Sequence, residues 1–278
     1  MRDSAREPRR PAAIGTILLG AAGALLLTFA GAARTGAQQE QNFEEYQDKG
    51  FYQSYIFGRP DSPSEEWLLA YGGRLYDMWW GVLFQDPPEV THPAYPASGK
   101  QSGAATWRCV ECHGWDYRGK DGAFATGPHA TGIEGVDGMA GADPARIAAI
   151  VRDDTHGYGP DMIPDEALQA LALFVSKGVF SMAPHIDPET GKLRGDAERG
   201  KRIYQNVCAI CHDFDGLAWI TGEDESLQSL SASASANPWR AMHKVMNGQT
   251  YADMPAMRVF GMEAVRDVLA YAQTLPRE

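Results

Sequence analysis

The sequence predicts a mainly α-helical protein made of two helical modules in tandem. The first observation is an internal repeat: a Gly-x-x-x-Tyr segment, a Cys-x-x-Cys-His string, a Pro-led amphipathic segment, an Asp-Met pair and a closing amphipathic segment occur in that order twice. The second is that apolar residues in both closing segments recur at the helical spacing i, i+3, i+4, i+7. Because the whole order is duplicated, two modules explain the chain better than one domain does.

In the first module, residues 62–182, Ser62 and Glu65 form a capping box that is expected to start the first helix. A closing helix follows Pro164, which suits a first helical turn, and ends at Gly178. The inward face of this closing helix is expected to carry apolar residues at helical spacing: Leu168, Leu171, Ala172 and Val175.

In the second module, residues 196–278, Asp196 caps a first helix that ends at Cys208, and Pro276 stops the last helix. Gly200 is expected to let these two helices cross closely, because it has no side chain. The apolar stripes are Gly200, Ile203, Tyr204 and Val207 on the first helix and Val265, Val268, Leu269 and Ala272 on the last.

Two segments outside these helices predict irregular structure. Residues 183–195 are interpreted as the linker between the modules, because residues 184–192 contain two prolines and a glycine that break any helical period. Residues 229–236 contain only serine, alanine and one leucine, and they are expected to form an exposed loop.

The two Cys-x-x-Cys-His strings use every cysteine of the chain. In such a string the thiols are placed to add to the two vinyl groups of a haem, and the histidine is placed to ligate the iron from the proximal side. A zinc site would need the two pairs to meet across 95 intervening residues. We therefore predict two covalently bound haems c, held by Cys109, Cys112 and His113 in the first module and by Cys208, Cys211 and His212 in the second.

These strings, the preceding Gly-x-x-x-Tyr segments, the downstream methionine loops and the closing helices together resemble the class I cytochrome c family, here in a tandem dihaem form. The resemblance covers residues 196–278 tightly and residues 62–182 more loosely. It implies that each helical module wraps one haem, that the cysteines bind it, that the histidine is the proximal ligand and that a loop methionine is the distal ligand.

The resemblance implies Met162 and Met254 as the distal ligands of the two irons. In the second module Met254 precedes a proline in a loop 42 residues after His212, with Met246 and Met257 as alternatives. In the first module Met162 occupies the matching Asp-Met position, and His156 competes with it. A thioether ligand raises the haem potential and a second histidine would lower it, so this choice decides whether the two haems are alike.

The modules differ in one place. Tyr204 lies four residues before Cys208, whereas Tyr76 lies 33 residues before Cys109, so the first module carries a 29-residue insertion ahead of its haem motif. Its tryptophans are expected to be packing groups. The insertion itself could be a lid over a haem edge, a surface that binds a partner, or an inert surface loop.

The N-terminus predicts export. Four arginines precede an apolar run over residues 12–33, and small residues follow, so residues 1–37 are interpreted as a signal peptide or, if uncleaved, as a membrane anchor. Residues 38–61 form an N-terminal extension. Because haem c is attached outside the bacterial cytoplasm, we expect a periplasmic protein, held at the inner membrane only if the N-terminal segment is retained.

The net charge restricts the partners. The formal charge is −11, and the first 37 residues contribute +3, so the remainder carries −14. Nucleic acid and anionic lipid are therefore unsuitable partners, whereas a periplasmic redox protein with a basic docking face would be attracted.

These features predict an electron-transfer protein with no catalytic residue, either a free carrier or the cytochrome subunit of a periplasmic oxidoreductase. The alternative is a dihaem enzyme, similar to thiosulfate dehydrogenases or dihaem peroxidases, with an exchangeable distal site on one haem. In the thiosulfate dehydrogenases that this alternative resembles, a cysteine is the distal ligand of the active haem. Both haem strings together use all four cysteines of this chain, so none is left for that role.

Overall fold

The structure is a computed structural model that describes residues 59–218, 229–250, 252 and 254–277. The predicted signal peptide or anchor, and most of the 38–61 extension, lie outside these residues. Both predicted modules fall within one compact unit, Gln47–Glu278, and their division into two domains stays a prediction. Within the described residues, no helix is long and apolar enough to cross a bilayer.

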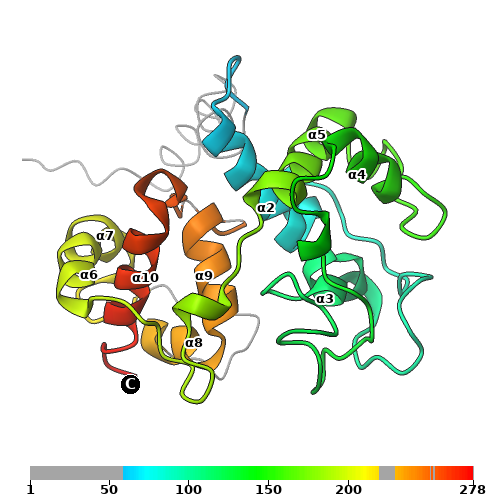
Figure 1. The fold of residues 1–278 in the computed structure, drawn as a ribbon. Helices are drawn as coiled ribbons and strands as arrows, with labels where there is room; N and C mark the ends of the chain where they lie inside the picture. Colours follow the sequence, from blue (N-terminus) through cyan, green and yellow to red (C-terminus); the bar gives the residue numbers. More distant parts are fainter. Residues whose placement is uncertain (1–58, 219–228, 251, 253, 278) are drawn as a thin grey trace, which may run out of the picture. The chain divides into compact units, whose positions relative to one another are not determined.

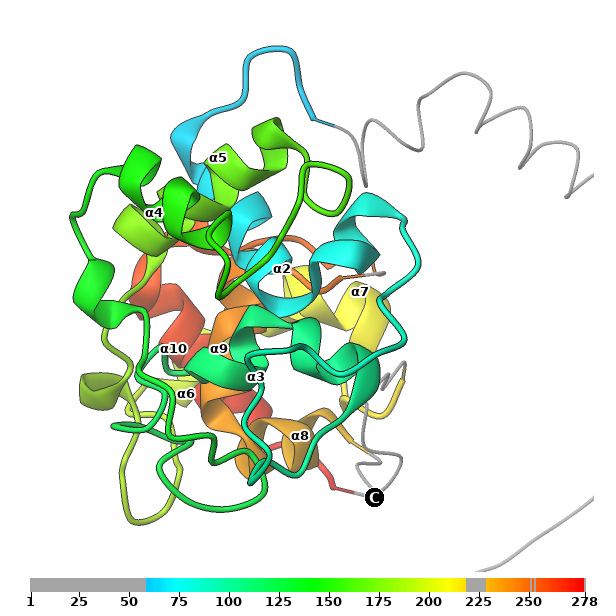
Figure 2. The same ribbon diagram turned by 90° about the vertical axis from the view of Figure 1, so that its right-hand side faces the viewer.

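The described residues confirm the mainly helical fold class, since they form no strand and only two isolated β-bridges. In Figures 1 and 2, α5 lies beside both α2 and α4, and α6 lies beside α10. The helices of the first module are α2 (Glu65–Leu83), α3 (Cys109–His113), α4 (Pro144–Val151) and α5 (Asp165–Leu173). The helices of the second module are α6 (Ala197–Ile203), α7 (Ala209–His212), α8 (Leu230–Ala236), α9 (Pro238–Asn247) and α10 (Gly261–Ala272).

The helix ends follow side-chain capping. Asp196 caps α6 as predicted, accepting hydrogen bonds from the backbone N–H groups of Glu198 and Arg199. The capping box expected at Ser62 is wrong: Ser64 is the N-cap of α2, and its hydroxyl accepts from the N–H of Trp67. The closing helix α5 continues as a π-helical turn to Gly178, where it was predicted to end.

Close helix crossings occur at equivalent glycines of the repeat. A Cβ atom placed on Gly200 would lie 1.9 Å from the carbonyl oxygen of Asp267 in α10. A Cβ atom on Gly72 would lie 2.2 Å from the carbonyl oxygen of Ala170 in α5. The predicted role of Gly200 is therefore confirmed, and the first module repeats it.

The prediction of an exposed loop at residues 229–236 is wrong. Residues Leu230–Ala236 form α8, capped by the hydroxyl of Ser229, which accepts from the N–H of Ala232. Ser231 and Ala234 are buried against the last helix, where the Gln273 amide donates to the carbonyl of Ala234. Small side chains allow this close packing, so composition alone was misleading.

Candidate haem sites

The first Cys-x-x-Cys-His string forms the helical turn α3. The helix places Cys109 and Cys112 one turn apart, with His113 at the end, and both thiols are free. Burial raises the pKa of both thiols to about 12, so they are held as neutral thiols. Two neutral, adjacent thiols on one turn are the groups that thioether attachment of a haem requires.

The imidazole of His113 is oriented by the loop that follows the string. Its Nδ1 donates to the carbonyl oxygen of Glu134 at 2.6 Å, which leaves the lone pair on Nε2. Burial lowers the pKa of His113, so the ring is neutral, the form that binds a metal. A ligand histidine whose other nitrogen is fixed in this way is the common arrangement at metal centres.

The second string offers the same kinds of donor group. Cys208 ends the π-helical turn that follows α6, and Cys211 and His212 lie in α7. Burial raises the pKa of the Cys208 thiol to about 11 and lowers the pKa of His212. The donor set of the second string therefore matches that of the first.

A tyrosine fixes the backbone after each string. Tyr76 of α2 donates its hydroxyl to the carbonyl of Gly114 at 2.7 Å, and Tyr204 donates to the carbonyl of Asp213 at 2.9 Å. Gly114 and Asp213 each follow the histidine directly and have positive φ angles of 81° and 54°. The repeat seen in the sequence is thus also a repeat of hydrogen bonds.

The donor groups fit haem and not a bare metal ion. All four cysteines are free, and the described residues hold no group of three or more His, Cys, Asp or Glu side chains that could bind a metal ion. The two cysteine pairs do not meet, as a shared zinc site would require. Each string instead offers two thiols and one neutral imidazole, which is what covalent haem attachment uses.

The predicted methionine ligands lie in loops. Met254 lies between α9 and α10, partly buried against the core, and Gly248 at the end of α9 would place a Cβ atom 2.8 Å from the Met254 carbonyl oxygen. Its alternatives, Met246 and Met257, are buried within the core. Met162 lies between α4 and α5 and also packs against the core.

The competing residue His156 lies near His113, the predicted proximal histidine of the first string. The ring centres of His113 and His156 are 6.3 Å apart, and the ring planes are within 19° of parallel. Asp153 accepts hydrogen bonds from the backbone N–H of His156 at 2.9 Å and from its Nδ1 at 3.1 Å. Asp153 therefore holds Nδ1 of His156, as the Glu134 carbonyl holds Nδ1 of His113, and in both rings Nε2 is the nitrogen left for a ligand.

The insertion packs against the loop that carries His156. His92 is 7% exposed, and its Nδ1 accepts from the N–H of Ala94, so its Nε2 donates to the carbonyl oxygen of His156 at 2.9 Å. Tyr158 donates its hydroxyl to the carbonyl of Trp107 at 2.8 Å. Sequence reasoning assigned no such role to His92, because its spacing from either haem motif carries no signal.

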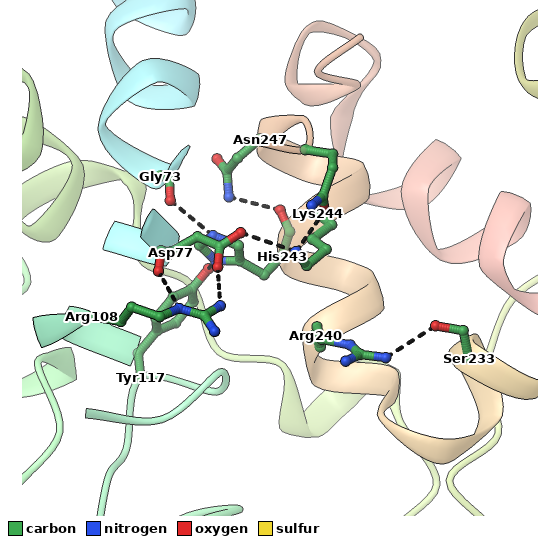
Figure 3. Close-up of polar contacts among 10 residues, drawn as sticks. Gly73, Asp77, Arg108, Tyr117, Ser233, Arg240, His243, Lys244 and Asn247 are labelled. Atoms are coloured by element: carbon green, nitrogen blue, oxygen red, sulfur yellow. Dashed lines mark hydrogen bonds and ion pairs between the residues drawn. The ribbon is translucent and has the colours of Figure 1, made fainter. Parts of the chain in front are cut away.

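A neutral hydrogen-bonded chain connects α9 with the first module (Figure 3). His243 is fully buried; its Nε2 donates to the carbonyl of Gly73 at 2.9 Å, and its Nδ1 accepts from the hydroxyl of Tyr117 at 2.8 Å. Burial lowers the pKa of His243 to about 4. The ring is therefore a neutral link between α9, α2 and the segment that follows the first haem string.

A buried ion-pair network lies beside this chain (Figure 3). Asp77 of α2 binds Lys244 of α9 at 3.1 Å and also binds Arg108, the residue directly before Cys109. Burial opposes ionisation of Asp77, but Lys244 and Arg108 together hold its pKa well below the usual range. Both cations also lie over the ring of Trp115, two residues after His113. The flanks of the first haem string are thus attached to α9.

A helical protein with two such strings belongs to the class of covalent haem proteins, and comparison with known proteins agrees. Residues 195–271 match the family described as cytochrome c oxidase, cbb3-type, subunit III. A cytochrome c-553-like protein of Synechocystis sp. is 35% identical over 38% of this chain and 90% of its own length. The chain belongs to the cytochrome c family, whose members bind haem c covalently and transfer electrons.

One further relative and one solved structure show weaker similarity. A cytochrome bc1 complex cytochrome c subunit of Mycobacterium bovis is 26% identical over 59% of this chain and 59% of its own length, so the chain spans little more than half of that relative. A thiosulfate dehydrogenase structure from Marichromatium purpuratum aligns with 86% of this chain and 54% of its own, at 17% identity and a TM-score of 0.21.

Proposed function

We propose that this protein is a dihaem c-type cytochrome that transfers electrons between periplasmic redox partners. The observation that carries the proposal is the duplicated local structure: a glycine crossing, a tyrosine hydrogen bond and a Cys-x-x-Cys-His turn occur once in each predicted module. Because this local structure suits the attachment of one haem c and is present twice, it supports the attachment of two haems. The modules proposed are residues 62–182 and 196–278, with 183–195 between them.

The residues have separate tasks. The four cysteines hold the cofactors, and His113 and His212 are the proximal ligands. Met254 is the proposed distal ligand of the second haem, because it is the methionine of its segment that is not enclosed in the core. When bound, each haem iron takes one electron from a reduced partner and gives one to an oxidised partner.

The subunit form of this function is favoured by the relatives. The family that matches residues 195–271 is named for a subunit of an oxidase, and the relative from Mycobacterium bovis is named as a subunit of a bc1 complex. By analogy, this chain would deliver electrons within or to a larger respiratory assembly. Its acidic surface suits a partner with a basic docking face.

The proposal is tested by counting haems on the protein produced with a cytochrome c maturation system. The denatured intact mass is expected to exceed the polypeptide mass by two haems. The double variant Cys109→Ala/Cys112→Ala should keep one haem, and Cys208→Ala/Cys211→Ala should keep the other. One haem or none on the wild-type protein would overturn the dihaem proposal.

A further inference from the structure

We infer that His156, and not Met162, is the distal ligand of the haem in the first module. The inference rests on the proposed haem at Cys109 and Cys112 and extends it to the ligand set. It also assigns a purpose to the 29-residue insertion, which the cytochrome fold of the second module lacks.

The first argument is the separation of the two imidazoles. Metal–imidazole bonds are about 2 Å long and a ring nitrogen lies about 1 Å from the ring centre, so two imidazoles on opposite sides of one metal have centres about 6 Å apart. The rings of His113 and His156 are 6.3 Å apart and nearly parallel. Packed aromatic rings have the same range of separations, about 4.5–7 Å, so the assignment also needs the orientation of both rings.

The second argument is the orientation of both rings by hydrogen bonds. His113 donates Nδ1–H to the carbonyl of Glu134, and His156 donates Nδ1–H to the carboxylate of Asp153. Both rings therefore present the lone pair on Nε2. A carboxylate or carbonyl behind each imidazole is the usual support of a metal-binding histidine.

The third argument is that the insertion holds the His156 loop in place. His92 donates to the carbonyl of His156 itself, and its ring packs on Trp107 with a centre-to-centre distance of 4.3 Å. The backbone N–H of His92 in turn donates to the Thr106 hydroxyl at 2.8 Å. A buried histidine with every nitrogen engaged fixes the loop on one side of the site, so it is a positioning residue for His156.

Met162 has no comparable arrangement. Its side chain packs against the apolar core, and its backbone N–H donates to the carbonyl of Gly159 in the turn before α5. Core packing does not distinguish Met162 from Met254, so the assignment of His156 rests on the positions of His113, His156 and His92.

The consequence is two unlike haems. Two imidazoles lower the potential of the first haem, whereas the proposed His212 and Met254 pair raises that of the second. With both haems bound, one electron passing from the first iron to the second would oxidise the first and reduce the second, and this direction would be downhill. The protein would then conduct electrons from module 1 to module 2.

The test compares three variants of the holoprotein by electron paramagnetic resonance and near-infrared magnetic circular dichroism, which distinguish bis-histidine from histidine–methionine ligation. The wild type is expected to contain one haem of each kind. His156→Gly should convert the first haem to a high-spin form, and added imidazole should restore the low-spin signal. Met162→Leu should leave both spectra unchanged.

The matched control is His129→Gln, because His129 is a histidine of the same module whose Nδ1 also bonds a carboxylate, that of Glu111. It should behave as wild type. Two histidine–methionine haems in the wild type, or loss of the first low-spin signal in Met162→Leu but not in His156→Gly, would overturn the inference. Intact mass distinguishes this inference from the dihaem proposal. A protein that carries two haems but shows no bis-histidine spectrum would refute His156 as a ligand and leave the dihaem proposal standing.

Discussion

At the scale of single residues, two buried polar side chains join α9 to the first haem string. Asp77 is ionised in the interior because Lys244 and Arg108 bind it. His243 is neutral in the interior because burial excludes its charged form. Each residue therefore has a charge state that depends on the folded structure, and each gives a prediction.

Replacing Asp77 should be strongly destabilising. Asp77→Ala removes the carboxylate that both cations bind, and breaking a buried ion pair costs about 3–5 kcal/mol. Glu65→Ala is the control, because Glu65 pairs with Lys177 on the surface with a side chain that is 54% exposed, and it should cost less than about 1 kcal/mol. Guanidinium denaturation of the holoproteins measures both, and equal losses would contradict the assigned role of Asp77.

The stability should depend on pH through His243. Its pKa is about 4 in the folded protein and about 6.5 when unfolded, so between these values the unfolded chain binds more protons. Stability is then complete above about pH 6.5 and falls toward pH 4, by up to about 1.4 kcal/mol per pH unit. In His243→Gln, the part of the pH dependence of the unfolding free energy that comes from this histidine should disappear. Parallel slopes for the two proteins, from denaturation at several pH values, would refute the assignment.

At the scale of helices, the glycine crossings test the packing. Alanine is favoured over glycine by about 1 kcal/mol in a helix, yet Gly200→Ala would force a Cβ atom against the backbone of α10. We expect a net loss of about 1–3 kcal/mol in unfolding free energy. Gly138→Ala is the control, because no atom lies within 4 Å of its added Cβ. A stabilised Gly200→Ala protein would show that the helices can separate without cost.

The hydrogen bond from His92 in the insertion to the carbonyl of His156 can be tested separately. His92→Phe keeps the ring that packs on Trp107 but removes the hydrogen bond to the His156 carbonyl, which is worth about 1 kcal/mol, or about five-fold in an equilibrium. Exogenous cyanide should then bind the first haem about five-fold more tightly. His92→Gln, which keeps an N–H donor, should restore most of the wild-type affinity. Unchanged cyanide affinity in His92→Phe would show that the insertion does not hold the loop that carries His156.

Much of this structure could be predicted from the sequence, and the exceptions have physical causes. The helical stripes, the Asp196 cap and the Gly200 crossing follow from local spacing, which the sequence displays directly. The Ser62 cap and the loop at residues 229–236 were wrong, because two serines compete for one cap and because small residues suit tight burial as well as exposure. The contact of His92 with His156 joins residues 64 positions apart. No local pattern encodes such a contact.

At the scale of the whole molecule, a buried interface links the first Cys-x-x-Cys-His string to α9 of the second predicted module. Helix α9 brings His243 and Lys244 onto α2 and onto the flanks of the first haem string (Figure 3). A rigid link of this kind would keep the distance between the haems constant, as electron transfer between them requires. The formal charge of −14 outside residues 1–37 would attract and orient the basic partner proposed above.

The most direct test of this account is a potentiometric titration of the holoprotein that counts electrons per chain and follows the haem absorption. We predict two electrons per chain, taken up in two one-electron steps, with the more negative step lost in Cys109→Ala/Cys112→Ala. A single electron per chain would contradict the central claim that both strings carry redox-active haem.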